Sequence, residues 1–460
     1  MSTIDPAIVT MCKRLIAIPS VTGEGTRQIA EFCAKEILAP HGIQIRLISS
    51  SAEGPEQVNL LAFIAGKNRD ATPLVLNTHL DTVPPGDPAL WTECNGRPLE
   101  ASIHGDRIYG LGAADTKLDF VAKATALAHC RVPARDVWLV GTFGEEHGLV
   151  GAKELAASGM LPRGAIALVG EPSHLQVITA HKGLMAYELT IRFVPIRVAD
   201  EIEVRKIFHV GRAAHSSTPT LGENAIVKAI AAISSKPSLE VVSIDGGDAV
   251  NKVPAHCEVV VAAESVSMLD SLHGEVIGRA THVIPVRVIA VIMEFIQALN
   301  QFAHSAGPPE PDYAAPTLTS NLGVISTRDN RIVMQFELRP PPSLALDAVR
   351  DGVSAIVREL AEGDESLEIK LTEKRANPGF RSSSGSEAVE LGMAALARAN
   401  LPMDNGVKAG CTEAGIYAAA GLQPIVFGPG PSTGVIHAPN EYNLLSEVAA
   451  AVRFYRALLE

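Results

Sequence analysis

The stretch Leu76-Asn-Thr-His-Leu-Asp-Thr-Val-Pro84 predicts both a strand of the fold and the chemistry at its end. The apolar residues 74–76 lead into it, so a buried strand is expected to end near His79 and Asp81. Residues two apart on an extended chain point to the same side. A carboxylate that accepts a hydrogen bond from one imidazole nitrogen leaves the other nitrogen for a metal ion. Alone, the pair also fits a solvated loop; the downstream clusters favour the metal.

Strand patterns alternate with helical patterns over residues 1–184, which predicts an α/β domain with a mostly parallel sheet. Residues 185–343 differ, because strand patterns there follow one another with few helices, as in an α+β module. After Pro340-Pro341-Pro342 the alternation of helix and strand returns through residues 344–460. We therefore expect a catalytic domain of residues 1–184 and 344–460, interrupted by a smaller domain.

Composition narrows the class of protein. A chain of 460 residues with 47% hydrophobic and 20% charged residues predicts a globular protein of more than one domain. The net charge of −12 argues against nucleic acid as a partner. No signal peptide or membrane span is expected, since the apolar residues 283–299 are interrupted by Arg287 and Glu294. Six cysteines without paired spacing fit a reducing cytosol, so we expect a cytoplasmic protein.

Polar clusters follow several predicted strands, where a parallel sheet gathers its ligands. They are His79 with Asp81, Asp115 with Lys117, Glu145-Glu146-His147, Glu171, and His437. Two histidines and three carboxylates suit one zinc ion or a pair, with Asp115 able to bridge. The lack of cysteine ligands favours a catalytic site, and bound zinc lowers the pKa of a water to near 7. Gly428 and Gly430 precede His437 and would let backbone amides approach a ligand.

Each cluster also has a plainer interpretation. Paired glutamates such as Glu145-Glu146 are usually a solvated helix start, and Lys117 fits a surface lysine equally well. Cys411 fits a small packed residue better than a nucleophile, because no Cys/His arrangement surrounds it.

The combined pattern resembles the di-zinc exopeptidase and aminoacylase family, which includes acetylornithine deacetylase, succinyl-diaminopimelate desuccinylase, aminoacylase and glutamate carboxypeptidase. The matching stretches cover nearly the whole chain: His79-Leu-Asp81-Thr-Val-Pro, Gly110-Leu-Gly-Ala-Ala-Asp115-Thr-Lys, Gly144-Glu-Glu146, Val169-Gly-Glu171-Pro, Ala180-His-Lys-Gly183, His215-Ser-Ser, Gly246-Gly-Asp-Ala-Val-Asn251-Lys-Val-Pro, Cys411-Thr-Glu-Ala414, Phe427-Gly-Pro-Gly430 and His437-Ala-Pro-Asn-Glu-Tyr442. The resemblance implies a zinc-exopeptidase-like catalytic domain with an inserted ferredoxin-like dimerisation or lid domain, and a homodimer.

The resemblance also implies a role for each matching residue. Asp115 would bridge two divalent metal ions, zinc in the first place and cobalt or manganese as alternatives. The other metal ligands would be His79 and Glu171 at one ion, and Glu146 and His437 at the second. Glu145 would be the general base toward a metal-bridging hydroxide, and Asp81 would orient His79. His215 would hold the oxyanion, in its own or the partner subunit's site. Asn251 and Arg339 would face the substrate, the arginine suiting a carboxylate.

The implied reaction is hydrolysis of the amide bond of a small N-acyl amino acid, as in acetylornithine deacetylase. In the family a glutamate at the position of Glu171 accompanies deacylases and carboxypeptidases. A dipeptidase or carboxypeptidase is the alternative, because the inserted domain is longer than a deacetylase needs. Its extra sequence includes residues 318–325, which makes Asn321 a rival to Asn251 for the substrate-facing role. Leu118 also departs from the family, which has glycine there. A non-catalytic scaffold protein is disfavoured, since all five ligand candidates and Glu145 are present.

Overall fold

The structure is a computed structural model that describes residues 4–236, 238–262, 274–364 and 366–460. The chain divides into two compact units. The first unit joins Met1–His181 with Phe380–Glu460, and the second is Lys182–Gly379. Each unit has a hydrophobic core of its own.

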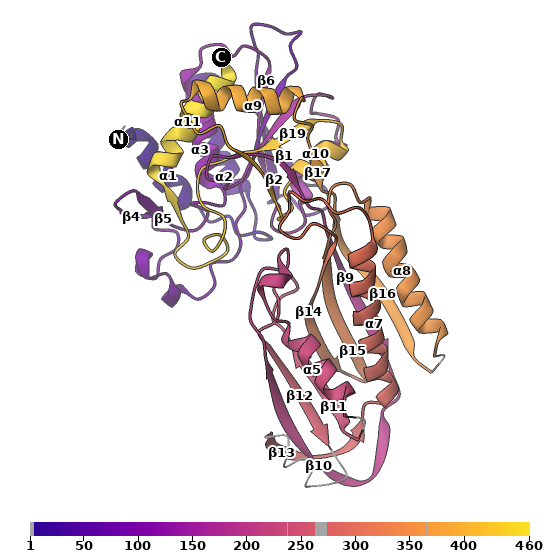
Figure 1. Cartoon of the computed structure of the whole chain (residues 1–460). Helices are drawn as coiled ribbons and strands as arrows, with labels where there is room; N and C mark the ends of the chain where they lie inside the picture. Colours follow the sequence, from indigo (N-terminus) through magenta and orange to yellow (C-terminus); the bar gives the residue numbers. More distant parts are fainter. Residues whose placement is uncertain (1–3, 237, 263–273, 365) are drawn as a thin grey trace. The chain divides into compact units, whose positions relative to one another are not determined.

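The first unit is built on a mixed sheet with a parallel centre (Figure 1). Among the described residues its strands are, in spatial order, β1 (Gln44–Ser49), β2 (Val58–Ile64), β6 (Val137–Thr142), β3 (Leu74–His79), β7 (Ile166–Gly170), β19 (Gln423–Val426), β8 (Val177–His181) and β17 (Phe380–Arg381), with β18 (Asn405–Lys408) beside β8. Strand β3 pairs in parallel with β6 and β7, and β19 pairs in parallel with β7. Four strands therefore end at one edge.

Alternate residues of these strands supply the cores on the two faces of the sheet. Leu74 and Leu76 belong to one core and Val75 to the other. Seven α-helices are described in this unit: α1 (Pro6–Ile16), α2 (Arg27–Phe32), α3 (Lys117–His129), α4 (Val150–Ala157), α9 (Glu387–Arg398), α10 (Ala414–Ala419) and α11 (Leu445–Leu459). Helices α1, α3, α9 and α11 supply the first core and α4 and α10 the second, which makes three layers. A small sheet of β4 (Ser102–His104), β5 (Arg107–Tyr109) and β20 (Tyr442–Leu444) completes the unit.

The second unit is an antiparallel sheet with helices on one face (Figure 1). Its described strands are, in spatial order, β13 (Glu275–Val283), β10 (Ile196–Val210), β12 (His256–Ala262), β11 (Glu240–Gly246), β14 (Thr319–Arg328), β15 (Arg331–Arg339), β9 (Leu184–Arg192) and β16 (Glu368–Asn377). Its described α-helices are α5 (Ala225–Ser234), α7 (Val286–Ser305) and α8 (Leu346–Glu362). Helix α5 begins where Asn224 caps it by accepting hydrogen bonds from the N–H groups of Ile226 and Val227.

The end of the second unit differs from the sequence-based boundary at residue 343. Helix α8 and strand β16 follow that boundary, and both lie in the second unit. The reason is strand pairing, because β16 runs antiparallel beside β9 from Leu184↔Asn377 to Arg192↔Glu368. The α8–β16 pattern looks like one more α/β repeat in sequence, and only its pairing partner shows otherwise.

Helix α7 is long and apolar enough, by length and composition, to cross a membrane. In this structure Val288, Ile292, Phe295 and Leu299 on this helix are buried in the core of the second unit. The apolar face of α7 thus packs within this core.

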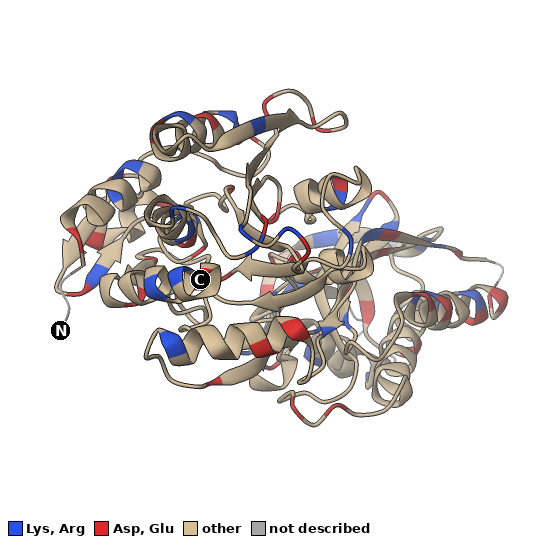
Figure 2. Cartoon of the chain, turned by 90° about the horizontal axis from the view of Figure 1, so that it is seen from above, with Lys and Arg blue, Asp and Glu red and all other residues tan. Residues whose placement is uncertain are grey.

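Figure 2 shows acidic and basic residues together on the surface helices. On α8, for example, Arg350 forms ion pairs with Asp347 and with Glu373 of β16. The excess of negative charge, −12 in total, thus lies on a surface that carries both acidic and basic residues.

Candidate metal centre

The predicted ligands lie at the edge where the parallel strands of the first unit end. His79 is the last residue of β3, and Glu171 directly follows β7. Glu145 and Glu146 follow β6, and His437 lies in the connection between β19 and β20. Asp115 precedes α3 by two residues. The sheet topology brings these segments together although the sequence separates them widely.

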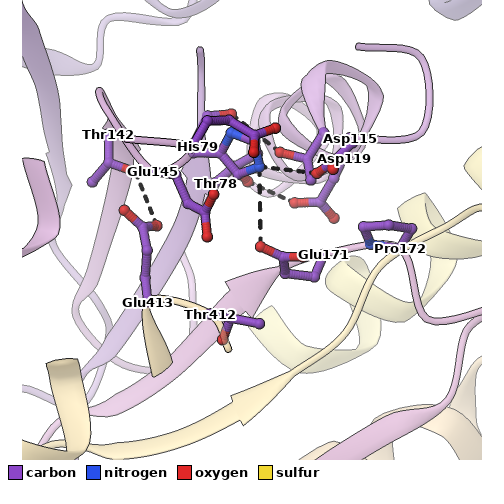
Figure 3. Close-up of polar contacts among 12 residues, drawn as sticks. Thr78, His79, Asp115, Asp119, Thr142, Glu145, Glu171, Pro172, Thr412 and Glu413 are labelled. Carbon is purple, nitrogen blue, oxygen red and sulfur yellow. Dashed lines mark hydrogen bonds and ion pairs between the residues drawn. The ribbon is translucent and has the colours of Figure 1, made fainter. Parts of the chain in front are cut away.

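The first group consists of His79, Asp115 and Glu171, all buried, with ligand atoms within 4.8 Å of one another. His79 Nε2 lies 3.0 Å from Asp115 Oδ1 and 4.0 Å from Glu171 Oε1. The other ring nitrogen, Nδ1, lies 3.0 Å from the backbone oxygen of Asp81. Figure 3 shows His79 directed toward Asp115 and Glu171. Nε2 is thus the nitrogen available to a metal ion.

The second group consists of Asp115, Glu146 and His437, again with ligand atoms within 4.8 Å of one another. His437 Nε2 lies 3.2 Å from Asp115 Oδ2 and 3.1 Å from Glu146 Oε1. Asp115 therefore belongs to both groups and directs one carboxylate oxygen to each histidine. This is the arrangement that a carboxylate needs to bridge two cations.

The electrostatics of the two groups favour cations. Burial opposes the charged forms of His79 and His437, yet hydrogen bonds to carboxylates prevail. The pKa of His79 is raised well above its ordinary value, and that of His437 rises to about 11. Burial raises the pKa of Glu146 and Glu171, and nearby Asp115 adds to both effects. Clustered buried carboxylates that hold imidazoles charged, with oxygen and nitrogen donors only, fit divalent metal ions.

Asp81 is fully buried and contacts both His79 and the segment that carries Glu145 and Glu146. Its carboxylate accepts hydrogen bonds from the backbone N–H groups of Glu145 at 3.1 Å and Glu146 at 3.2 Å. Asp81 Oδ1 lies 3.6 Å from His79 Nδ1, farther than its own backbone oxygen. The expected orientation of His79 thus comes first from the backbone of Asp81. The carboxylate mainly fixes the turn that carries Glu145 and Glu146.

A family model and curated relatives match this chain. The model "Peptidase family M20/M25/M40" matches residues 75–460. The chain belongs to this family. Acetylornithine deacetylase of Photorhabdus laumondii is 29% identical over 55% of this chain and 66% of the relative. The chain thus spans just under two thirds of that relative. Acetylornithine deacetylase of Yersinia pseudotuberculosis is 27% identical over 70% of this chain and 82% of the relative.

The fold comparison agrees with the M20/M25/M40 membership. Aminoacylhistidine dipeptidase from Vibrio alginolyticus matches with a TM-score of 0.71 and 19% identity, over 100% of this chain and 97% of that one. This likeness supports the predicted α/β catalytic domain with a second domain. Family membership indicates a metal-dependent hydrolase, which confirms the resemblance read from the motifs.

The second unit of this M20-family chain brings His215 and Asn251 together. A backbone bridge pairs His215 with Lys252, and Ser216 N–H donates to the Asn251 oxygen at 3.1 Å. His215 and Asn251 are both exposed. His215 Nδ1 lies 2.7 Å from the Ser217 hydroxyl. Two residues that the sequence separates thus lie on adjoining segments.

Asn321 and Asn251 lie in different surroundings. Asn321 is 3% exposed and donates from Nδ2 to the Val250 oxygen at 3.1 Å and the Lys252 oxygen at 2.8 Å. It therefore holds the backbone on both sides of Asn251. This geometry favours Asn251 as the residue that presents a side chain and Asn321 as its support.

Arg339 is 6% exposed, and its Nε lies 2.8 Å from Glu337 Oε1. Arg339 Nη2 also lies 3.4 Å from the Ser216 hydroxyl, which itself donates to Glu337. Within the second unit the guanidinium is thus neutralised by Glu337. A substrate carboxylate, the predicted partner of Arg339, would therefore have to share the guanidinium with Glu337.

The loop after β19 contains Gly428 and Gly430, and we call it the glycine loop. Its backbone N–H groups donate to side chains of this chain. Gly428 N–H donates to the Ser173 hydroxyl at 3.1 Å, and Gly430 N–H donates to Glu447 at 2.7 Å. A Cβ at Gly428 would lie 2.6 Å from the Glu171 oxygen, so glycine is required for close approach. Gly428 thus packs against the Glu171 backbone and Gly430 against the Asn443 side chain, and a contact of their amides with a ligand stays a prediction.

Three polar residues of the site escaped the sequence-based prediction. Lys408 Nζ lies 3.1 Å from Glu171 Oε2. Glu413 is buried, accepts from the Thr142 hydroxyl at 2.9 Å and also hydrogen-bonds Asn77. Glu441 is 2% exposed and accepts backbone hydrogen bonds near Asp115. Glu413 and Glu441 lie in the quoted motifs around Cys411 and His437, which was the available signal. No pattern pointed to Lys408.

Proposed function

We propose that this chain hydrolyses the amide bond of a small N-acyl amino acid with two divalent metal ions. The observation that carries the proposal is the shared position of Asp115, whose two carboxylate oxygens lie 3.0 Å from His79 and 3.2 Å from His437. One ion would be held by His79, Asp115 and Glu171, and the other by Asp115, Glu146 and His437. Bound divalent ions would polarise the amide carbonyl and lower the pKa of the attacking water.

Glu145 is assigned to proton transfer. Glu145 is 8% exposed, and Figure 3 shows it beside His79 in the same cluster. Glu145 would take the proton that water loses when its oxygen attacks the carbonyl carbon. As the C–N bond breaks, the same carboxyl would deliver that proton to the leaving amine nitrogen. Asp81 holds the backbone N–H of Glu145 at 3.1 Å and so fixes the segment that carries this side chain.

The second unit would contribute substrate contacts. His215 would stabilise the oxyanion, and Asn251 and Arg339 would bind polar groups of the amino acid, as the family resemblance implies. We also propose a homodimer on the same ground, which the mass in solution would establish.

Two features support an N-acyl amino acid as substrate. Glu171 has the residue type that accompanies deacylases and carboxypeptidases in the resemblance, and acetylornithine deacetylases are among the relatives of this chain. The alternative is a dipeptidase or carboxypeptidase. Its support is the length of the second unit, Lys182–Gly379, which contains the additional strand β14 with Asn321.

Release of free amine from a mixed panel tests the proposal. The panel contains N-acetyl, N-succinyl and N-formyl amino acids and unblocked dipeptides, each with added zinc or cobalt and with a chelator control. We expect chelator-sensitive cleavage of N-acyl amino acids. Cleavage confined to dipeptides would move the chain to the peptidase alternative, and cleavage unaffected by chelator would overturn the metal assignment.

A further inference from the structure

One residue collects most of the backbone N–H groups of the loop that carries Asp115. Glu441 Oε1 accepts from Ala114 N–H at 2.8 Å and from Asp115 N–H at 3.0 Å. Glu441 Oε2 accepts from Gly112 N–H at 3.2 Å, and the Glu441 backbone oxygen accepts from Gly110 N–H at 3.0 Å. Four donors of this loop thus end on one residue.

A carboxylate suits this position for physical reasons. Converging backbone N–H groups form an anion-binding concavity, and the loop also leads into the N-terminus of α3, where negative charge is favoured. Hydrogen bonds to an ionised acceptor are stronger than neutral ones. Because Glu441 is 2% exposed, water cannot replace it without rearrangement of the loop.

Asn443 strengthens the same connection from two residues further on. Alternate residues of an extended segment point to one side, so Asn443 follows Glu441 into the loop. Its Nδ2 donates to the Ala113 oxygen at 2.9 Å and to the Pro429 oxygen at 3.2 Å. Asn443 therefore joins the Asp115 loop to the glycine loop after β19. We call Glu441 and Asn443 the β20 clamp.

We propose that the β20 clamp positions Asp115 so that its two carboxylate oxygens face the two histidines at the same time. Glu441 holds the backbone N–H of Asp115 itself and follows His437 by four residues. One residue thus fixes the bridging carboxylate relative to a ligand of the second group. Glu441 touches no reacting atom and acts as a positioning residue. The inference rests on the proposed function only in taking Asp115 as a metal ligand.

A graded pair of variants tests the clamp. Glu441→Gln keeps one acceptor oxygen but turns an amide N–H₂ group toward the loop, and Glu441→Leu removes both acceptors. We expect metal affinity, measured by competition with a chromophoric chelator, to fall roughly 10–100-fold in Glu441→Leu and less in Glu441→Gln. Asp136→Asn is the matched control, since Asp136 is also buried and accepts a backbone N–H, that of Gly66 at 2.8 Å, away from the site.

Hydrogen exchange of the metal-free protein gives a second readout without turnover. Peptides covering residues 110–116 should exchange faster in Glu441→Gln than in the wild type, and peptides elsewhere should be unchanged. Wild-type metal affinity and wild-type exchange in both Glu441 variants would overturn the clamp. A wild type that binds no metal would instead overturn the proposed function, so the two failures are distinguishable. If Glu441→Leu fails to fold, Glu441→Gln and the exchange data still decide.

Discussion

The two units of this chain place their polar residues in opposite ways. In the first unit, carboxylates and histidines crowd the edge where β3, β6, β7 and β19 end; His79, Asp115 and Glu171 are buried there, Glu146 is half-buried and His437 is exposed. In the second unit, an apolar core lies between the antiparallel sheet and helices α5, α7 and α8. His215 and Asn251 lie on exposed loops of this unit. A parallel sheet aligns several strand ends, so one edge can assemble many ligands. An antiparallel sheet alternates its ends and leaves function to a few loop residues.

The same contrast holds for buried charge. The second unit pairs the buried charges of Glu337 and Arg339 at 2.8 Å. The first unit also contains such a pair, Asp119 and Lys123 at 2.7 Å, but it adds carboxylates in excess of its buried cations around Asp115. An excess of buried negative charge is costly unless a cation neutralises it. Chemistry and pH sensitivity are therefore expected in the first unit.

The sharpest test of this contrast is Glu145→Gln in the first unit. We expect kcat to fall 10²–10⁴-fold, because glutamine cannot accept the proton from water. Metal content and the unfolding midpoint should stay at wild-type values, since the backbone contact with Asp81 uses only the Glu145 N–H. Steady-state turnover of the best panel substrate, with metal analysis of the same sample, measures both.

Glu154→Gln is the control for that variant. Glu154 lies on α4 and accepts from the Ser50 hydroxyl at 2.6 Å, outside the two ligand groups. It should keep kcat within about twofold, as expected for a surface substitution. Substantial turnover in Glu145→Gln would remove Glu145 from proton transfer.

The next test uses the excess buried charge of the first unit. Burial raises the pKa of Glu413 from 4.5 to about 7. Between these values the folded state keeps the proton that the unfolded state has lost, so stability falls as pH rises through this window. Glu413→Gln, which resembles the protonated acid, should lack this loss. The free energy of unfolding should differ between the two proteins by up to roughly 3 kcal/mol more at pH 7 than at pH 4.5.

Urea unfolding of the metal-free proteins at several pH values measures this difference. Burial also raises the pKa of Glu441 to about 7, but Glu441 contributes equally to both proteins and cancels. Parallel stability profiles for the wild type and Glu413→Gln would show that Glu413 is not protonated in the folded chain.

The first unit was also the easier one to predict from sequence. His79, Glu146 and Glu171 each follow an apolar strand pattern closely, so the rule for parallel sheets predicted one common edge. Asp115 and His437 were also among the polar clusters of the sequence, and the family resemblance implied which ion each would bind. Glu441 could not be predicted in the same way, because its partners are backbone N–H groups about 330 residues away, which leave no side-chain pattern.

The second unit shows what local pattern cannot supply. Residues 344–379 alternate helix and strand as a catalytic domain would, yet β16 pairs with β9. The partner strand β9 lies about 180 residues earlier, and no local feature of the β16 sequence predicts this pairing. Likewise, the sequence left Asn251 and Asn321 as equals. The structure distinguishes them, because Asn321 hydrogen-bonds the two backbone carbonyls beside Asn251 and therefore supports that segment.

The smallest expected effect belongs to the second unit and concerns Asn321. Asn321→Ala removes both hydrogen bonds to the segment around Asn251. If Asn251 faces the substrate, we expect kcat/KM to fall about tenfold, the loss of one or two hydrogen bonds. Since Asn321 acts through Asn251, the double variant Asn251→Ala/Asn321→Ala should lose little more than Asn251→Ala alone.

Ser320→Ala is the matched control for Asn321→Ala, because Ser320 is the neighbour on β14 and donates instead to Asn300 at 2.9 Å. It should leave kcat/KM unchanged. Losses that add in the Asn251/Asn321 double variant would mean that Asn321 meets the substrate independently. Such additivity would restore Asn321 as a substrate-facing residue and give the second unit a larger share in recognition than its antiparallel architecture suggests.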